Sequence, residues 1–239
     1  MQKTIGNYLL YLFAFSTLFI HAYAAEKAAT KPEWQEDQLS WKEISNQDDI
    51  VVYEATERDP ATGIIPLKVN AVLNYPIPRI LSVLGNSDRK IEWVPKVKET
   101  KVVEQIGPYE KIEYARYISP WPFADRDFLV HIKGWQDEKN ETVYIQMKSV
   151  DHSGMPTNKR FVRAETQIGN VMLKPVNGDK NKTFVQMTFL TNFKGNIPVW
   201  AVNFVQKKWP RGMMEKLTRQ LEKNDIVVEE KYKFNLERS

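Results

Sequence analysis

The sequence of 239 residues contains no cysteine. This absence excludes thiol catalysis, iron–sulfur clusters, disulfide bonds and zinc sites built from cysteine. A chain of this length can bury enough apolar surface to fold without disulfides, so the absence is compatible with export and fits a bacterial periplasm. There is also no cysteine after the N-terminal apolar run, which is where a bacterial lipoprotein would carry its anchor.

Histidine is scarce, and the common catalytic motifs are missing. The three histidines are His21 in the N-terminal apolar segment, His131 on the polar phase of a predicted strand, and His152 in a predicted turn. No HExxH, GxGxxG or P-loop pattern occurs. The run Asp125-Arg126-Asp127 permits an acid–base pair, but we favour an ion-paired turn that fixes a loop against a sheet. We therefore expect a protein that is not an enzyme and that uses no metal or cofactor.

Charge of one sign is not in large excess. The chain has 34 Lys and Arg against 30 Asp and Glu, a net charge of +4, and the charges are interspersed. This balance argues against a nucleic-acid partner. It supports at most a mild attraction to anionic membrane surfaces.

Long apolar runs are absent apart from one near the N-terminus. Residues 8–20 form an apolar run of 13 residues that follows Lys3 and precedes Ala22-Tyr23-Ala24. Such a pattern is typical of a secretory signal peptide. We therefore expect residues 1–24 to be removed by cleavage near Ala24, residues 25–34 to be a flexible leader, and the mature protein to be periplasmic or secreted. A retained anchor is the weaker alternative, because a membrane-spanning helix needs roughly 20 apolar residues.

The rest of the chain combines short helices with many strands. The patterns predict a helix at 32–41, strands at 50–55 and 67–73, and helices at 76–85 and 88–93. From residue 97 the apolar period changes to two, which is typical of half-buried antiparallel strands. The strand phases expected to face a core or a cavity are Ile112, Tyr114, Arg116 and Ile118, then Phe128, Val130 and Ile132, then Val143, Ile145 and Met147.

The last predicted element is a long amphipathic helix. Pro198 suits the first turn of a helix, where its missing N–H costs nothing. An apolar stripe at helical spacing follows, made of Val202, Val205, Trp209, Met213, Leu217 and Leu221. We expect a helix of roughly 25 residues, kinked at Pro210 and Gly212. Together the elements predict an α+β fold in which a curved antiparallel sheet grips this helix.

Arg116 stands out because it shares a strand phase with Tyr114. A buried arginine needs an acidic side chain or a bound anion, since an unpaired buried charge is very costly. A phosphate headgroup would match its bidentate donors. The alternatives are a buried ion pair with an aspartate or glutamate, and a bulge that turns the side chain outward.

Three segments carry a specific resemblance to a known family. Residues 119–128 read Ser-Pro-Trp-Pro-Phe-Ala-Asp-Arg-Asp-Phe, residues 194–203 read Lys-Gly-Asn-Ile-Pro-Val-Trp-Ala-Val-Asn, and a third piece lies between them at 150–165. Their order, spacing and content resemble the START lipid-binding domain over residues 35–225, which leaves 226–239 as a C-terminal tail. The resemblance implies a helix-grip fold with a tunnel for one lipid and no catalytic residues.

The resemblance also assigns roles to particular residues. It places a loop at the tunnel mouth, with gate residues Pro120, Trp121, Pro122 and Phe123, and it makes the helix from Pro198 the lid. The residues expected to line the tunnel are Tyr114, Arg116, Phe128, Val130, Ile132, Val143, Ile145, Met147, Val202, Val205, Trp209 and Met213. In sterol-binding members a buried arginine lies four residues after the phenylalanine of the Arg-Asp-Phe run, where this chain has Ile132.

The sequence thus predicts an exported, monomeric lipid-binding or lipid-transfer protein that holds one lipid and contacts membrane surfaces transiently. The departure at Ile132 favours a phospholipid or another amphiphile over a sterol. One alternative is an enzyme of the same fold that acts on a hydrophobic small molecule. Another is an interaction module with a filled core, which would leave no cavity for an acyl chain.

Overall fold

The computed structural model describes residues 38–137, 139 and 141–233. The predicted signal peptide at 1–24 and leader at 25–34 lie outside the described residues, as does the end of the predicted tail. The chain divides into Met1–Gln38 and Leu39–Ser239, and the description below concerns the second unit. Most of the helix predicted at 32–41 is also outside the described part, and its last residue, Trp41, begins a strand.

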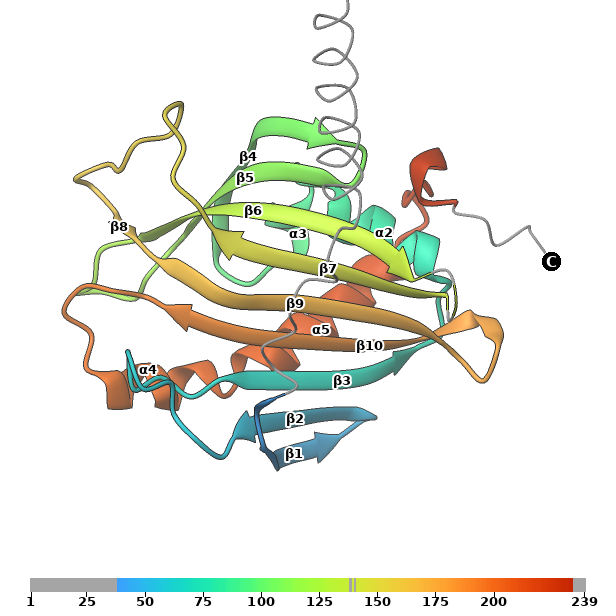
Figure 1. The fold of residues 1–239 in the computed structure, drawn as a ribbon, viewed down its shortest axis with the longest axis horizontal. Helices are drawn as coiled ribbons and strands as arrows, with labels where there is room; N and C mark the ends of the chain where they lie inside the picture. Colours follow the sequence, from blue (N-terminus) through green and yellow to red (C-terminus); the bar gives the residue numbers. More distant parts are fainter. Residues whose placement is uncertain (1–37, 138, 140, 234–239) are drawn as a thin grey trace, which may run out of the picture. The chain divides into compact units, whose positions relative to one another are not determined.

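One curved sheet of ten strands forms the body of this unit (Figure 1). The strands are β1 Trp41–Gln47, β2 Ile50–Ala55, β3 Leu67–Leu73, β4 Val97–Gly107, β5 Glu110–Tyr117, β6 Arg126–Asp137, β7 Thr142–Ser149, β8 Val162–Arg163, β9 Glu165–Val176 and β10 Asp179–Asn192. Their order is β1-β2-β3-β10-β9-β7-β6-β5-β4 with antiparallel pairing, and β8 pairs with β6 in parallel. The strands predicted at 50–55 and 67–73 coincide with β2 and β3.

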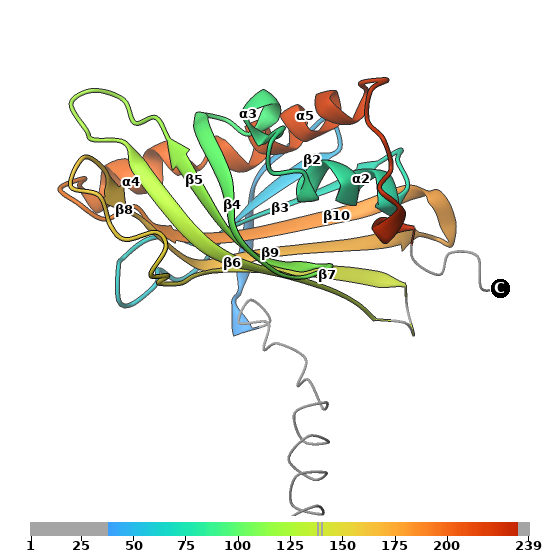
Figure 2. The same cartoon turned by 90° about the horizontal axis from the view of Figure 1, so that it is seen from above.

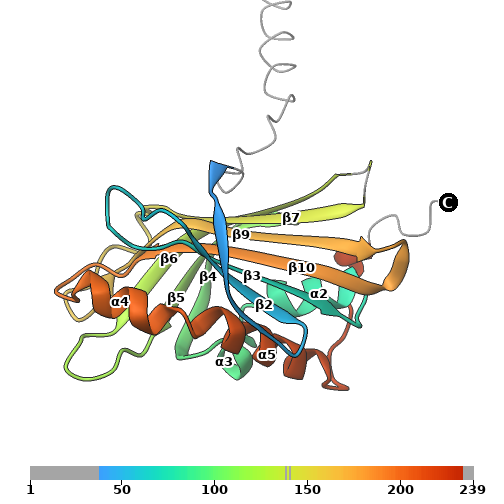
Figure 3. The ribbon, with the colours of Figure 1, turned by 90° about the horizontal axis from the view of Figure 1, so that it is seen from below.

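The helices all lie along one face of the sheet (Figures 2 and 3). They are α2 Ile77–Gly85, α3 Lys90–Trp93, α4 Val199–Gln206, α5 Trp209–Leu221 and the short 3-10 helix η2 Glu230–Tyr232. Among the described residues, no helix is long and apolar enough to cross a membrane. The predicted α+β fold, a curved antiparallel sheet that grips a C-terminal helix, is therefore confirmed.

The C-terminal helix is broken rather than kinked. Instead of one helix of roughly 25 residues, the structure has α4 and α5, separated at Lys207 and Lys208. Pro210 lies in the first turn of α5. This position is one that proline tolerates, whereas in the middle of a continuous helix its ring would clash with the preceding turn. Proline thus starts a second helix and moves the break to the residues before it.

The packed core occupies only part of the space between sheet and helices. Its largest fully buried side chains come from the sheet and from α2 and α5, and they include Ile80, Leu173, Met187, Met214, Leu217 and Leu221. The predicted tail from residue 226 contributes to this core, because Ile226 packs against it and Tyr232 is only 8% exposed. Residues 226–233 therefore belong to the packed unit.

Candidate functional site

A large internal cavity lies between the sheet and the helices. Its volume is about 1070 Å³, and its walls combine apolar side chains from the sheet with side chains from α2 to α5 and η2. Small-molecule sites usually enclose roughly 300–1,000 Å³, so this cavity has room for a large ligand. The structure therefore lacks the filled core expected for an interaction module within the described residues.

The middle of the sheet provides the main apolar wall. Six residues predicted to line a tunnel do line the cavity, three from β6 and three from β7: Phe128, Val130, Ile132, Val143, Ile145 and Met147. Successive side chains on a strand point to opposite faces, so each run of alternate residues follows one face. Ile132, the position at which the resemblance expects an arginine in sterol-binding members, is one of these wall residues.

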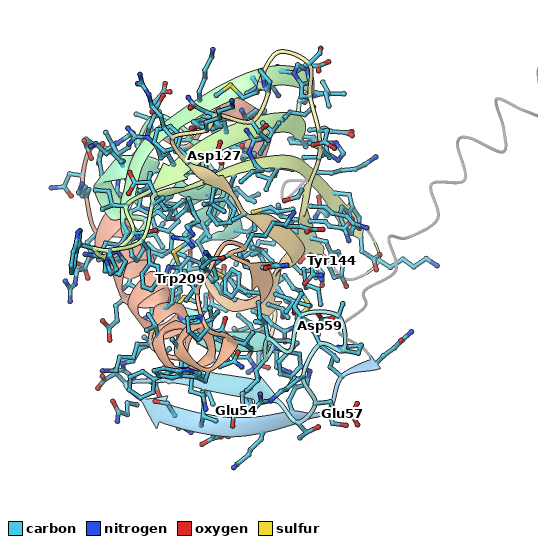
Figure 4. All side chains as sticks on the ribbon, turned by 90° about the vertical axis from the view of Figure 1, so that its left-hand side faces the viewer. Glu54, Glu57, Asp59, Asp127, Tyr144 and Trp209 are labelled. Atoms are coloured by element: carbon cyan, nitrogen blue, oxygen red, sulfur yellow. The ribbon has the colours of Figure 1, made fainter. Side chains whose placement is uncertain are left out.

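The broken C-terminal helix provides the opposite wall. Val202 and Val205 from α4 and Trp209 and Met213 from α5 all line the cavity, as predicted. The Trp209 ring, labelled in Figure 4, packs edge-on against Phe189 of β10 with ring centroids 4.8 Å apart. Val205 is 68% exposed, so it lies at the rim of the cavity rather than inside it.

Two amides fix α4 against the loop between β2 and β3. Asn203, only 6% exposed, accepts a hydrogen bond from the Ile65 N–H at 3.0 Å and donates one to the Gly63 carbonyl at 3.1 Å. Gln206 donates to the Ile65 carbonyl at 2.9 Å. All three bonds join uncharged groups, and Lys207, the residue after α4, adds an ion pair to Glu54 of β2 at 2.7 Å.

On β5 the phase expected to face a core or a cavity reaches a core at Ile112 and Tyr114, but the tunnel-lining role expected for Tyr114 and Arg116 is wrong. Tyr114 and Arg116 do not line the cavity, whereas the alternate residues Lys111, Glu113 and Ala115 do. Residues directly opposite in an antiparallel pair share a face. In the pairing of β5 with β6, Ala115 is opposite Phe128, Glu113 is opposite Val130 and Lys111 is opposite Ile132. Lys111, Glu113 and Ala115 therefore share the face of the sheet on which the β6 residues line the cavity. Ile112, Tyr114 and Leu129 instead form a second apolar cluster, with Val103, Val150 and Met155 packed against it.

Arg116 is held by an ion-pair network outside the cavity. Its Nη1 donates to Asp125 Oδ2 at 3.2 Å and its Nε to Glu99 Oε2 at 3.3 Å. Its guanidinium also lies over the Phe161 ring, 4.9 Å from the centroid. Arg116 therefore has the acidic partners that one sequence alternative required, and it is not placed to meet a ligand in the cavity.

The predicted gate loop contributes half of its named residues to the cavity. Pro120 and Phe123 line the cavity, whereas Trp121 and Pro122 do not. Trp121 is 92% exposed. The loop thus has an inner pair, Pro120 and Phe123, and an outer pair, Trp121 and Pro122, while its role as a gate stays a prediction.

Arg126 is a site residue whose role the sequence did not reveal. It is 3% exposed and lines the cavity. Its guanidinium donates to the Ala124 carbonyl at 2.6 Å, and across the mouth to the carbonyls of Phe193 at 3.2 Å and Lys194 at 3.1 Å. Burial lowers the pKa of Arg126. This arginine thus ties the gate loop to the segment that leads into α4.

A charged cluster lies in the cavity wall farther along β5. The Glu113 carboxylate accepts hydrogen bonds from Lys90 Nζ, from Ser87 Oγ at 2.6 Å and from Lys111 Nζ at 2.9 Å. Lys111 Nζ also donates to Ser87 Oγ at 2.6 Å and to the Gly85 carbonyl at 2.9 Å. The sequence shows Lys111 and Glu113 only as the polar phase of a strand, and their partners from α2 and α3 are separated from them by more than twenty residues.

The two lysines determine the ionisation of this carboxylate. Burial alone would raise the pKa of Glu113, but the charges of Lys90 and Lys111 and the hydrogen bonds from Lys90 and Ser87 outweigh burial and lower it to about 2. Burial and the charge of Lys90 both lower the pKa of Lys111. Within the described part of the chain, no group of His, Asp and Glu side chains is placed to hold a metal ion.

Tyr232 of η2 closes the cavity beside this cluster. A Cβ atom on Gly85 would stand 2.0 Å from the Tyr232 hydroxyl oxygen, so only glycine leaves room for the ring. Tyr109 donates a hydrogen bond from its hydroxyl to the Lys231 carbonyl at 2.6 Å and ties η2 to the start of β5. In Figure 1, η2 and α2 lie at one end of the sheet and α4 at the other.

A curved antiparallel sheet closed by a C-terminal helix over an apolar cavity defines a helix-grip ligand-binding domain. The START domain model matches residues 22–223, and the chain belongs to this family. A STAR-related lipid transfer protein from Xanthomonas axonopodis has the same fold, with a TM-score of 0.67, 20% identity, and coverage of 77% of this chain and 99% of that chain.

Curated relatives are similar over part of their length. Steroidogenic acute regulatory protein from Danio rerio is 31% identical over 127 residues, which are 52% of this chain and 43% of the relative. Ceramide transfer protein from Mus musculus is 24% identical over 184 residues, which are 71% of this chain and 30% of the relative. The chain therefore spans about half or less of the length of these relatives.

Proposed function

We propose that the protein binds one lipid in the cavity and carries it between membranes. The observation that carries the proposal is the cavity of about 1070 Å³ with its mainly apolar walls. Moving an acyl chain from water into such a cavity is favourable by about 0.8 kcal/mol per CH₂. A membrane offers the same gain, so transfer is nearly balanced, and the protein acts by shielding the lipid from water. Membership of the START domain family and the lipid-transfer names of two relatives support this proposal.

The chemistry of the polar cluster argues against catalysis. A general base works best when its pKa is near the working pH, and the pKa of Glu113, about 2, is far below it. Ser87 is not activated as a nucleophile, because neighbouring Lys111 donates all three of its N–H groups to oxygens and has no lone pair for a proton. We therefore propose a carrier rather than an enzyme.

The wall at β6 favours a phospholipid or another amphiphile over a sterol. Ile132 lines the cavity at the position where the resemblance expects an arginine in sterol-binding members. An aliphatic side chain there supplies no donor for a sterol hydroxyl. A ligand with its polar group elsewhere in the cavity fits this wall better.

An exposed apolar surface beside the mouth is the proposed membrane contact. It consists of Trp121, Trp200, Phe204 and Val205, which are 92%, 73%, 70% and 68% exposed. Large exposed apolar surfaces mark interaction sites. Burying Trp200 or Phe204 in a bilayer would contribute about 3 kcal/mol each. Glu54 partly neutralises the charge of Lys207, 2.7 Å away, whereas the neighbouring Lys208 is exposed, so this surface combines apolar side chains with a basic one.

We further propose that the protein is a monomer exported after cleavage near Ala24. The N-terminal pattern Lys3, apolar run and Ala22-Tyr23-Ala24 supports export. N-terminal sequencing of protein recovered outside the cytoplasm tests this proposal. A first residue of Ala25 is expected, whereas an intact N-terminus would contradict the proposal.

Lipid extraction and vesicle transfer test the proposed function. Mass spectrometry of organic extracts from gently purified protein should find one lipid class in a ratio near one per chain. The double variant Trp200→Ser with Phe204→Ser should slow transfer of a fluorescent phospholipid between vesicles at least tenfold. It should melt as the original protein does, since exposed substitutions usually change stability by less than about 0.5 kcal/mol.

A matched control separates the proposed contact from general loss of exposed apolar surface. Val227, 79% exposed, lies after α5 and outside the surface defined above. Val227→Ser should leave transfer unchanged. Equal transfer by the double variant and the control would contradict docking through α4, and the absence of any extracted or transferred lipid would contradict the function itself.

A further inference from the structure

The cavity has an excess of positive charge that its apolar character does not require. Seven basic and four acidic side chains line it, a formal excess of three positive charges. Some of these charges are balanced locally, for example Lys231 by Glu229 at 2.9 Å. The cluster at β5 is not balanced, because Lys90 and Lys111 share one carboxylate, Glu113.

Burial makes this imbalance costly. Glu113 is 3% exposed, and the side chains of Lys90 and Lys111 are 15% and 12% exposed. A buried charge is strongly unfavourable unless it is paired, and one carboxylate neutralises only one of the two ammonium groups. A purely structural cluster would be expected to be neutral. The arrangement therefore leaves a place for a second negative charge.

The hydrogen bonds indicate which lysine would receive that charge. An ammonium group has three donors. Lys111 uses all three on Glu113, Ser87 and Gly85. Within the described part of the chain, Lys90 Nζ donates to one acceptor, Glu113, and Lys90 lines the cavity. Lys90 is thus the member with donors left for a ligand.

We infer that the cluster around Lys90 is a subsite for the oxyanion headgroup of an amphiphile, either a phosphate or a carboxylate. The inference rests on the proposed function and names the ligand class of the same cavity. A headgroup here would lie at the η2 end, and the apolar wall of β6, β7, α4 and α5 would receive the tail. An added negative charge would also oppose the effects that lower the pKa of Lys111.

A series of amphiphiles with one tail tests the headgroup preference. The probes are dodecyl phosphate, dodecanoate, dodecylphosphocholine and dodecanol, whose equal tails bury similar apolar area. Binding to the purified protein is measured by titration calorimetry at constant ionic strength. The two probes with exposed oxyanions should bind more tightly than dodecanol. A preference for dodecyl phosphate assigns a phosphate headgroup, and a preference for dodecanoate assigns a carboxylate.

Two variants with the same charge change locate the effect. Lys90→Met should weaken binding of the preferred anion roughly tenfold, the change expected from losing one charge-assisted hydrogen bond, and should leave dodecanol binding unchanged. Lys101→Met, an exposed position on β4, should change neither.

The outcomes distinguish this inference from the function on which it rests. If Lys90→Met weakens all four probes equally, or none of them, the cluster is structural and the inference is wrong while lipid binding stands. If anions bind no better than dodecanol, the inference is likewise wrong. If no probe binds the original protein, the proposed function fails, and this inference fails with it.

Discussion

Replacing Glu113 by glutamine should reveal how strongly the charged cluster stabilises the fold. Glu113→Gln keeps the shape of the side chain but removes the carboxylate that Lys90 and Lys111 share. Removing one partner of a buried ion pair costs about 3–5 kcal/mol. The lowering of the Glu113 pKa from 4.5 to about 2 gives a similar figure, about 3 kcal/mol at 1.36 kcal/mol per unit. In a domain of this size, such a loss lowers the melting temperature by roughly 6–12 °C.

The pH dependence identifies the cause of that loss. The pKa of Glu113 is lower in the folded protein than in the unfolded chain, so the carboxylate stabilises the fold at pH values above its ordinary pKa. This contribution disappears as the pH falls from about 4.5 toward 2. The gap in stability between the original protein and Glu113→Gln should therefore be constant from about pH 5 to 7 and narrow in acid.

Thermal melts followed by circular dichroism at a series of pH values provide the measurement. Glu222→Gln is a matched control, because Glu222 is exposed and the same charge is removed. It should melt within about 2 °C of the original protein at pH 7. The reasoning would be refuted by a Glu113→Gln variant that melts like this control, or by a gap that stays the same at pH 2 and pH 7.

Three further substitutions test other parts of the site. Arg126→Leu leaves the carbonyls across the mouth without their donor, so it should cost about 2–4 kcal/mol in melts and speed lipid exchange with vesicles; unchanged exchange would show that Arg126 does not hold the mouth. Gly85→Ala should cost about 2–4 kcal/mol by displacing Tyr232, and adding Tyr232→Ala should cost less than the sum of the two single losses, as a double-mutant cycle measures. Arg116→Leu should lower the free energy of unfolding by about 1–3 kcal/mol and leave lipid binding unchanged. Weaker lipid binding by this variant would indicate that Arg116 does contact the ligand.

Local periodicity was sufficient to predict several elements of the fold. The strands β2 and β3 were predicted with their observed bounds, and α2 begins one residue after its predicted start. These elements each have one apolar face, and the period of that face gives the element type. The interruption of the C-terminal helix was predicted at Pro210 and Gly212, but it lies at Lys207 and Lys208. The sequence shows where Pro210 is but not that it occupies the first turn of a new helix.

Periodicity failed on β5 because both faces of this strand are covered. Ile112 and Tyr114 are buried under Val150 and Met155, which belong to a distant segment, so the apolar phase points away from the cavity. The phase that faces the cavity is set by the pairing of β5 with β6. Neither the covering segment nor the register can be derived from the alternation of one strand. The charged cluster around Glu113 was missed for a similar reason, because its partners Ser87 and Lys90 lie far from it in the sequence.

The two ends of the cavity are held by different kinds of interaction, and this difference decides which end should open. At the mouth, Arg126 binds backbone carbonyls, and Asn203 and Gln206 hold α4 through uncharged groups. Toward the η2 end of the cavity, ionised Glu113 of β5 is bound by two lysines. Bonds between uncharged groups contribute about 0.5–1.5 kcal/mol each and bonds from a charged donor such as Arg126 about 1.5–3 kcal/mol, whereas breaking the buried ion pairs of Glu113 costs about 3–5 kcal/mol. The Lys207–Glu54 ion pair beside α4 adds about 1 kcal/mol or less, because the Lys207 side chain is 41% exposed. We therefore expect α4 to be the element that moves, because its amide bonds are individually weak and the bonds of Arg126 to Phe193 and Lys194 can stay in place. This movement would expose the cavity beside Trp200 and Phe204, the side chains proposed to enter the membrane.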